Sequence, residues 1–302
     1  MTYTLIAVLV VLTLSHLMPD LARWRRHQWF ARWLAWLGEY SGQAWRQGWM
    51  LLVSLGLPLL ALGLVMAVLA QPLHDIAWLI TAVIVLFLVW GPRDFDQDID
   101  AIASAAPAER PVLVSSLLGG PVPMTAEAAI AAAARATLRR WFGPLLWFLL
   151  LGPVGALLYR LSQLAAEDNA DLLSADQRQA AAQLLAVLDW PAVHLMSLGM
   201  AIATDFDNVM RAWRGRLRLM GGLWRLDPGL LPVVSAAAVR ADLEDRDDLE
   251  GHDAASLGSL GGAASGAPEL GGLLRDVRSL AWRLLVVWLA LIALIALVAL
   301  LA

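Results

Sequence analysis

Five stretches of the sequence are apolar over about the length that a helix needs to cross a lipid bilayer. They cover residues 3–19, 50–70, 73–90, 141–159 and 284–302. A sixth stretch, residues 184–203, is apolar at its ends but contains Asp189, Pro191 and His194. It is either a tilted span or a re-entrant or interfacial helix. Because about 20 apolar residues cross the hydrocarbon core, the pattern predicts an all-α fold: a polytopic membrane helix bundle of five to six spans, with amphipathic interfacial helices and cytoplasmic helical loops.

The composition supports a membrane setting and excludes several classes of protein. Hydrophobic residues make up 60% of the chain and charged residues 16%, against about 45–50% and 25% in soluble domains. There is no cysteine, and all 22 basic residues are arginine. Disulfide frameworks, thiolate chemistry and a phosphate-binding loop lysine are therefore excluded. The net charge of −4 argues against nucleic acid as a partner.

The distribution of arginines predicts the orientation of the spans. Cytoplasmic loops are enriched in basic residues, and arginines crowd residues 20–46, the end of 91–140, and 211–225. We expect an external N-terminus and cytoplasmic loops at 20–46, 91–140 and 205–280. The acidic segment 161–183 is expected outside. A tight hairpin at residues 71–72 would connect the second and third spans.

The chain is predicted to divide into three parts. Residues 1–239 form the helix bundle with its cytoplasmic loops, and residues 273–302 form the C-terminal span. Between them, residues 240–272 are acidic and then rich in Gly, Ser and Ala, which is typical of a flexible tether. Within the first part, residues 23–39 have the pattern of an amphipathic helix with Trp29, Phe30, Trp33, Trp36 and Leu37 on its apolar side. An Ala-rich helix at 125–140 is expected to be N-capped by Thr125.

Carboxylates are most concentrated just after the third apolar stretch. Asp94 and Asp98, next to Arg93, would share one helix face and could hold Mg²⁺ with waters and a phosphate. The plainer interpretation is a solvated helix start. Asp189 lies within an apolar stretch, where charges usually face a cavity or a partner. We interpret it either as a ligand or ion contact, with Arg160 as a candidate partner, or as a helix N-cap.

The remaining polar groups give weaker signals. His194 could titrate near neutral pH, although a hydrogen-bonded structural role is the commoner case. The arginines between Arg211 and Arg218 could hold an anionic headgroup, or they could simply set the orientation of the span. No catalytic residue and no metal site is assigned.

Several motifs of the chain resemble the AmpE family. The most specific are RRWFGPLLWF at 139–148 and GPVGALLYRL at 152–161. Supporting stretches are WGPRD at 90–94, VLDW at 187–190, and DFD at 205–207 with Trp213 following. The resemblance covers most of the chain except residues 240–272. A more distant similarity connects this family to the CbiB/CobD membrane family of cobalamin biosynthesis.

The resemblance implies a bacterial inner (cytoplasmic) membrane protein with several spans. It would act as a non-enzymatic regulatory or signalling modulator in β-lactamase induction and cell-wall recycling. Candidate ligand-binding residues are Arg93, Asp94, Asp98, Arg140 and Asp189. Expected partners are the lipid bilayer and a cytoplasmic cell-wall-recycling amidase or a muropeptide ligand.

The alternative is a Mg²⁺-dependent membrane transferase or ligase, similar to the adenosylcobinamide-phosphate synthase, with Mg²⁺ as its cofactor. The enzyme branch carries an Asn-Thr-Leu-Asp-Ser-Met stretch after the Tyr-Arg pair, whereas LSQLAA follows Arg160 here. His194 also replaces an arginine that both branches usually carry. These departures favour a protein without a cofactor that is not an enzyme.

Overall fold

The computed structural model describes residues 2–17, 27–90, 95–105, 109, 112–113, 115, 125–222, 225–250 and 267–301. In these residues it contains ten α-helices and no β-strand, which confirms the all-α class. Four helical stretches among them are long and apolar enough to cross a membrane: Met50–Leu69, Ala126–Asp168, Ala175–Ala203 and Leu274–Leu294. Two further apolar stretches, Thr4–Leu14 and Ile76–Val89, are shorter.

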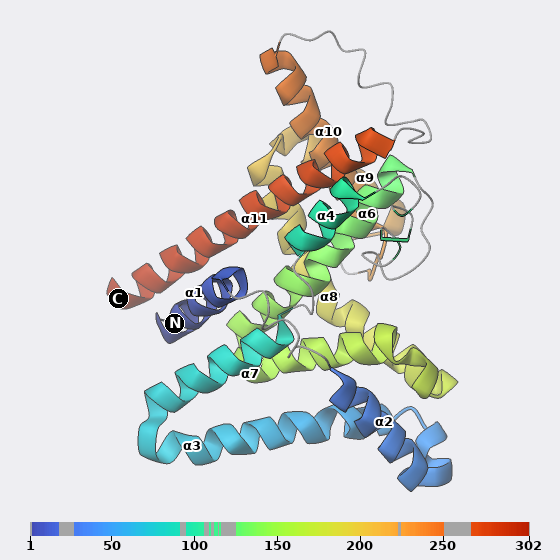
Figure 1. Cartoon of the computed structure of the whole chain (residues 1–302), viewed down its shortest axis with the longest axis vertical. Helices are drawn as coiled ribbons and strands as arrows, with labels where there is room; N and C mark the ends of the chain where they lie inside the picture. Colours follow the sequence, from blue (N-terminus) through green and yellow to red (C-terminus); the bar gives the residue numbers. More distant parts are fainter. Residues whose placement is uncertain are drawn as a thin grey trace. The chain divides into compact units, whose positions relative to one another are not determined.

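The helices fall into two compact units (Figure 1). In chain order they are α1 (Thr2–Leu17), α2 (Gln28–Ser41), α3 (Met50–Val89), α4 (Phe95–Ser104), α6 (Ala126–Thr137), α7 (Gly143–Gln163), α8 (Ala175–Ala203), α9 (Phe206–Met220), α10 (Leu230–Glu250) and α11 (Ala267–Leu301). Two π-helical segments, η3 (Leu138–Phe142) and η4 (Leu164–Asp168), flank α7. Short 3-10 segments, η2 (Gly42–Arg46) and η5 (Ala170–Leu172), follow α2 and η4. The first unit comprises residues 1–92, 139–189 and 293–302, and the second residues 93–138 and 190–292.

In the first unit, α1 and α7 both pack against α3. The apolar side of α2 contributes Phe30 and Leu34 to a core shared with Leu55 of α3 and Leu161 of α7. Trp36, on the predicted apolar side of this helix, is 51% exposed and does not contribute to this core. The buried positions Phe30, Leu34 and Leu37 are spaced by four and three residues, as expected for one helical face.

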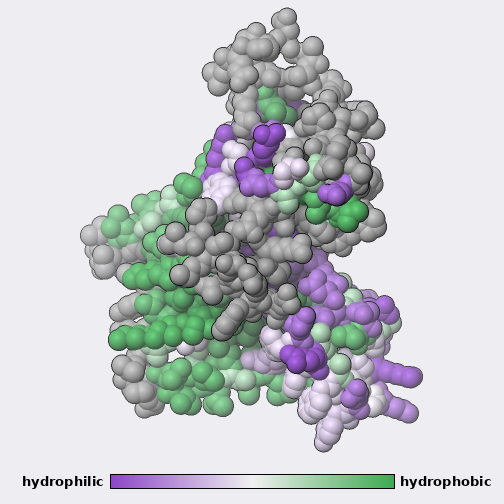
Figure 2. Space-filling model, viewed as in Figure 1, coloured by the Kyte–Doolittle hydropathy of each residue, from purple (hydrophilic) through white to green (hydrophobic). Residues whose placement is uncertain are grey.

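The chain reverses direction within α3. Residues 71–72, predicted as a tight hairpin, are helical, and Figure 1 shows the ribbon of α3 turning back on itself near its middle. The first half of α3 exposes an apolar stripe at Leu60, Leu64 and Val68. In Figure 2 this helix is covered by hydrophobic side chains, while the surface around α2 and η2 is largely hydrophilic. The first unit therefore has an apolar part and a polar end.

In the second unit, α10 packs against α6 and α9. Helix α6 is N-capped as predicted, because the Thr125 hydroxyl accepts a hydrogen bond from the Ala128 amide at 3.2 Å. Helix α9 begins at a comparable cap, where Asp205 accepts from the amides of Asp207 and Asn208. A side-chain oxygen at this position satisfies amides that have no helical partner.

The flexible tether predicted at 240–272 is wrong at both ends. Helix α10 continues to Glu250 and α11 already begins at Ala267, while residues 251–266 lie outside the described part of the chain. The acidic segment continues as a helix because it is not only acidic: Val239 and Ala241 are buried, and the buried Asp242 accepts a hydrogen bond from Arg283 at 2.5 Å. Packing and one ion pair override the disorder that the composition suggested.

Candidate functional site

The predicted span at 141–159 is not a single straight helix. Helix α7 is broken at Gly152, whose φ of 66° and ψ of −154° are not helical, and Pro153 follows. Proline has no amide hydrogen to continue the ladder, and glycine adopts positive φ without strain. Together they divide the apolar stretch into two arms, residues 143–151 and 153–163.

The two arms lie side by side in antiparallel directions. A Cβ atom on Gly143 would overlap the phenol ring of Tyr159, and one on Gly155 would overlap the carbonyl oxygen of Trp147. The residue numbers in each of these pairs are symmetric about the break near residue 151. α7 is therefore a helical hairpin with an apolar tip, at which Leu150 and Leu151 are exposed.

Neither arm of α7 is long enough by itself to cross a bilayer, although the whole stretch Ala126–Asp168 is. The first arm of nine residues is about 13 Å long, at 1.5 Å per residue. A hydrocarbon core is about 30 Å thick. Arg139, before the first arm, lies 3.1 Å from Glu167, after the second. The prediction that residues 139–140 and 161–168 lie on opposite sides of the membrane is therefore wrong.

A buried ionic network closes the base of this hairpin. Asp189 of α8 accepts a hydrogen bond from the Tyr159 hydroxyl at 2.8 Å and pairs with Arg139 Nη1 at 2.6 Å. The other terminal nitrogen of Arg139 pairs with Glu167. The side chains of Arg139 and Asp189 are only 14% and 13% exposed, and Tyr159 is fully buried. Trp147 secures the same junction by donating its indole hydrogen to the Leu188 carbonyl at 2.9 Å.

The network continues along α7 to a second buried arginine. Glu167 accepts from Gln163 Nε2 at 3.3 Å, and Gln163 Oε1 accepts from Arg160 at 2.7 Å. Burial and the charge of Arg160 lower the pKa of His27 from 6.5 to about 4. His27 is therefore neutral at pH 7 and can donate Nε2–H to the Leu88 carbonyl at 3.1 Å.

This arrangement fixes helices in place more readily than it binds a cation. Both oxygens of Asp189 already have partners, one cationic and one a hydrogen-bond donor. A metal ion at Asp189 would therefore have to share these oxygens with Arg139 and Tyr159 and lie beside a guanidinium cation. A charged side chain at membrane depth is stable only when it is paired. Loss of one residue of the network would therefore leave its partners buried without a counter-charge, at a large desolvation cost.

Of the five residues predicted as ligand contacts, the structure places two in the first unit. Asp189 has a charged partner as expected, but that partner is Arg139 rather than Arg160. The N-cap interpretation of Asp189 is wrong, since α8 begins at Ala175. Arg140 is half-buried in η3 beside Arg139. Arg93 and Asp94 lie outside the described residues, as does the side chain of Asp98, so the acidic pair remains a prediction.

Sequence reasoning missed Arg139, Tyr159 and Glu167 as members of the site. The available signal was the Gly-Pro pair in the middle of an apolar run, which commonly breaks a helix. Folding the run about that pair brings residue 143 onto 159 and residue 139 toward 163. Both ends of the network also lie in π-helical segments, which occur frequently at functional sites.

The arginine cluster of α9 in the second unit is partly neutralised within the chain. Arg216 forms a two-pronged pair with Asp227, at 2.7 and 3.0 Å. This pair holds the pKa of Asp227 below its ordinary value. His194 donates Nδ1–H to the Trp190 carbonyl at 2.8 Å, as a structural histidine would.

Among the described residues, no group of three or more His, Asp and Glu side chains is placed to hold a metal ion. No protein-family model, curated protein or solved structure matches the chain.

Proposed function

We propose that the protein is a multi-span bacterial inner-membrane modulator of the AmpE type, without enzymatic activity. The observation that carries the proposal is the pairing of both Asp189 oxygens, one with Arg139 and one with Tyr159. A network that joins η3, α7, η4 and α8 makes their relative positions depend on a few ionic contacts. A modulator needs such an element, because an input at one helix must change the position of another.

In this proposal the modulator affects β-lactamase induction through a cytoplasmic partner, either a cell-wall-recycling amidase or a muropeptide. The alternative is a Mg²⁺-dependent membrane transferase that uses Asp94, Asp98 and Asp189 as ligands. It requires a metal ion to bind Asp189 beside the guanidinium of Arg139, in competition with Arg139 and Tyr159. The intact network thus favours the modulator.

The test is β-lactamase induction in a Gram-negative host that lacks its own family member. We expect the wild-type chain to change the induction ratio after exposure to a β-lactam, and Asp189→Asn to abolish that change. Asp176→Asn, at an exposed position of the same helix, is the matched control and should behave as wild type. An induction ratio unaffected by the wild-type chain at normal expression would refute the proposal.

A binding measurement distinguishes the transferase from the modulator. Purified protein in detergent would be titrated with ATP, with and without Mg²⁺, beside the Asp94→Asn, Asp98→Asn double variant. Saturable Mg²⁺-dependent binding that is lost in the double variant would favour the transferase, and turnover would then be sought.

The membrane placement can be tested separately because the natural chain has no cysteine. Single-cysteine variants at Arg46 and Asp171 would be labelled with a maleimide that cannot cross the membrane. Ser174 donates a hydrogen bond to the Arg46 carbonyl at 3.2 Å, so we expect both cysteines to be labelled from the same side. Labelling from opposite sides would contradict the re-entrant arrangement of α7.

A further inference from the structure

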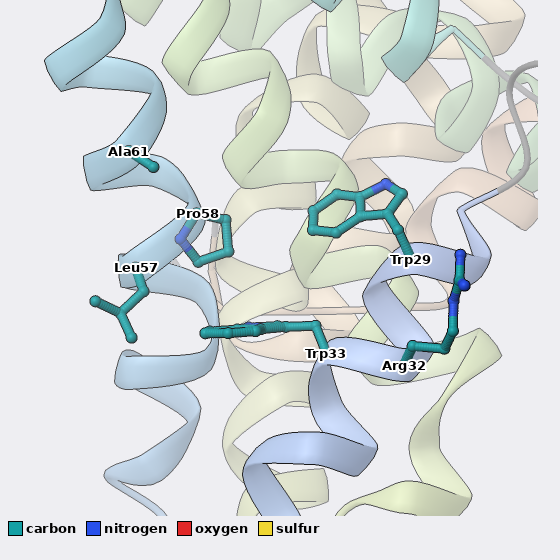
Figure 3. A pocket seen from close by; sticks show the side chains of 6 residues that line it. All are labelled: Trp29, Arg32, Trp33, Leu57, Pro58 and Ala61. Carbon is teal, nitrogen blue, oxygen red and sulfur yellow. The ribbon is translucent and has the colours of Figure 1, made fainter.

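An open groove lies between the amphipathic helix α2 and the first half of α3, away from the ionic network. Its volume is about 690 Å³, and it is lined by Trp29, Arg32, Trp33, Leu57, Pro58 and Ala61. Figure 3 shows the two indoles extending from α2 toward α3, with Arg32 leaving α2 on the side away from Leu57. The groove thus has apolar walls and a cationic edge.

A hydrogen bond from a side chain to the backbone connects the two walls of the groove. Pro58 has no amide hydrogen, so the carbonyl of Ser54, one turn earlier in α3, lacks its helical donor. The indole of Trp33 supplies the missing donor, with Nε1 3.0 Å from the Ser54 oxygen. A carbonyl without a donor is costly in an apolar environment. The contact therefore fixes Trp33 against α3 and keeps the groove open beside it.

The surface next to the groove indicates that its occupant comes from the bilayer. Leu60 and Leu64 of α3 are 68% and 62% exposed, and they continue the apolar wall outward. Ala61 lies eleven residues into α3, roughly 16 Å along the helix axis. An acyl chain that follows this wall would run from the polar end of the unit into the hydrocarbon region.

Arg32 supplies the charge that such an occupant must complement. It is exposed, and no described carboxylate lies within ion-pair distance of it. Trp29 and Trp36 are also exposed on α2. Tryptophan and arginine at the end of a membrane helix typically sit at the level of the lipid headgroups.

We propose that this groove binds an anionic phospholipid, with its phosphate at Arg32 and one acyl chain against Trp29, Trp33, Leu57, Pro58 and Ala61. Such a site selects lipids by headgroup charge while the apolar wall supplies most of the contact area. A bound lipid would attach α2 to α3 without any new protein contact. The proposal needs only a membrane protein and does not depend on the regulatory function.

The test is native mass spectrometry of the detergent-purified protein, titrated with phosphatidylglycerol and with phosphatidylcholine of the same acyl chains. One guanidinium near a membrane surface contributes about 1 kcal/mol toward an anionic lipid. We therefore expect Arg32→Gln to weaken phosphatidylglycerol binding about fivefold and to leave phosphatidylcholine binding unchanged. Ala61→Phe fills the groove and should weaken the binding of both lipids.

Arg46→Gln is the matched control, because Arg46 is exposed near the same end of the unit but does not line the groove. We expect it to bind both lipids as wild type does. Equal losses for Arg32→Gln and Arg46→Gln would overturn the proposal in favour of nonspecific attraction. Unchanged binding by Ala61→Phe would also overturn it, as would displacement of phosphatidylglycerol by an equal concentration of inorganic phosphate. All three substituted positions are exposed, and an unchanged helical circular dichroism spectrum confirms that each variant is folded.

Discussion

The two units of the protein use charged side chains in different surroundings. In the first unit, Arg139 and Asp189 have side chains that are 14% and 13% exposed, and they belong to a continuous network. In the second unit the ion pairs are separate. Asp100, 65% exposed, pairs with Arg278, 28% exposed, at 2.7 Å. Two other pairs join a buried carboxylate to a more exposed arginine: Asp227, 6% exposed, with Arg216, 29% exposed, and Asp242, 10% exposed, with Arg283, 46% exposed.

This difference indicates what determines the stability lost when a charged side chain is removed. It depends on how buried the side chain is and on how many partners it has. An exposed pair can exchange its partner for water, so it typically contributes about 0–1 kcal/mol. A buried pair has no such substitute, and removing one partner leaves an uncompensated charge. We therefore expect the connected pairs of the first unit to be more sensitive to single changes than the exposed Asp100–Arg278 pair of the second.

The largest effect is expected for Arg139→Gln. This change leaves Asp189 and Glu167 without their shared cation, and we expect the free energy of unfolding to fall by about 3–5 kcal/mol. Unfolding by sodium dodecyl sulfate in mixed micelles would measure it. Arg178→Gln, exposed on α8, should change stability by less than about 0.5 kcal/mol.

A double variant sharpens this result. Replacing a buried ion pair by apolar residues of similar volume is often neutral. Arg139→Met combined with Asp189→Leu should therefore recover part of the stability lost in Arg139→Gln. A double variant less stable than both single ones would mean that the network contributes more than charge compensation.

The second prediction concerns the space that the network requires. Gly143 lies against the ring of Tyr159, and a methyl group there would overlap it. Gly143→Ala should displace the phenol, weaken its hydrogen bond to Asp189, and destabilise the protein by about 1–3 kcal/mol. Gly63→Ala is the control, since an added Cβ meets no atom within 4 Å there. Equal stability of the two variants would show that the arms of α7 are not in close contact.

The third prediction is a pH dependence in the first unit. Burial and Arg160 lower the pKa of His27 to about 4, so the unfolded chain takes up a proton near pH 6.5 and the folded chain does not. Stability is fully present above pH 6.5 and declines as the pH falls toward 4. We expect a loss of the order of 1–3 kcal/mol across that range, after discounting for partial solvent access. His27→Asn should flatten this part of the stability curve.

The sequence predicted the helices better than it predicted their paths. The apolar runs gave the helical class and most helix positions, because hydrophobic length and periodicity are local properties. The reversal near residues 71–72 was predicted, although as a hairpin between two helices rather than as a bend within α3 (Figure 1). The reversal in α7 was harder to predict, since a long apolar run looks the same whether it crosses or returns. Gly152 and Pro153 were visible, but a break alone does not give the angle between two arms.

The site was predicted only at Asp189. A carboxylate in an apolar run is an evident signal, because its burial requires a partner. The identity of that partner depends on the hairpin, which brings Arg139 to Asp189 across fifty residues of sequence. Tyr159 gave no signal of its own, since a tyrosine near the end of an apolar run is common in membrane proteins.

The fourth prediction tests the tolerance of the second unit. Asp100→Asn removes the carboxylate that pairs with Arg278. Because Asp100 is mostly exposed, we expect a loss of no more than about 1 kcal/mol, reduced further at high salt. The same micelle titration would measure it. A loss as large as that of Arg139→Gln would remove the distinction between the two units.

The smallest effect is expected at Asp227, and it shows only at low pH. Hydrogen bonds from Arg216 hold the pKa of Asp227 below its ordinary value of 3.8. The pair therefore stabilises the folded state fully above that value, and this contribution is lost as the pH falls through the lowered pKa. Hydrogen exchange of the α9 amides should accelerate in wild type between pH 5 and pH 2.5 relative to an unfolded reference, whereas Asp227→Asn should lack this component. Because Arg216 remains charged throughout, the transition reports the carboxylate alone. An unchanged pH profile in the variant would mean that solvent screens this pair through the 29% exposed Arg216. The contrast with Asp189, whose arginine partner is 14% exposed, would then become sharper.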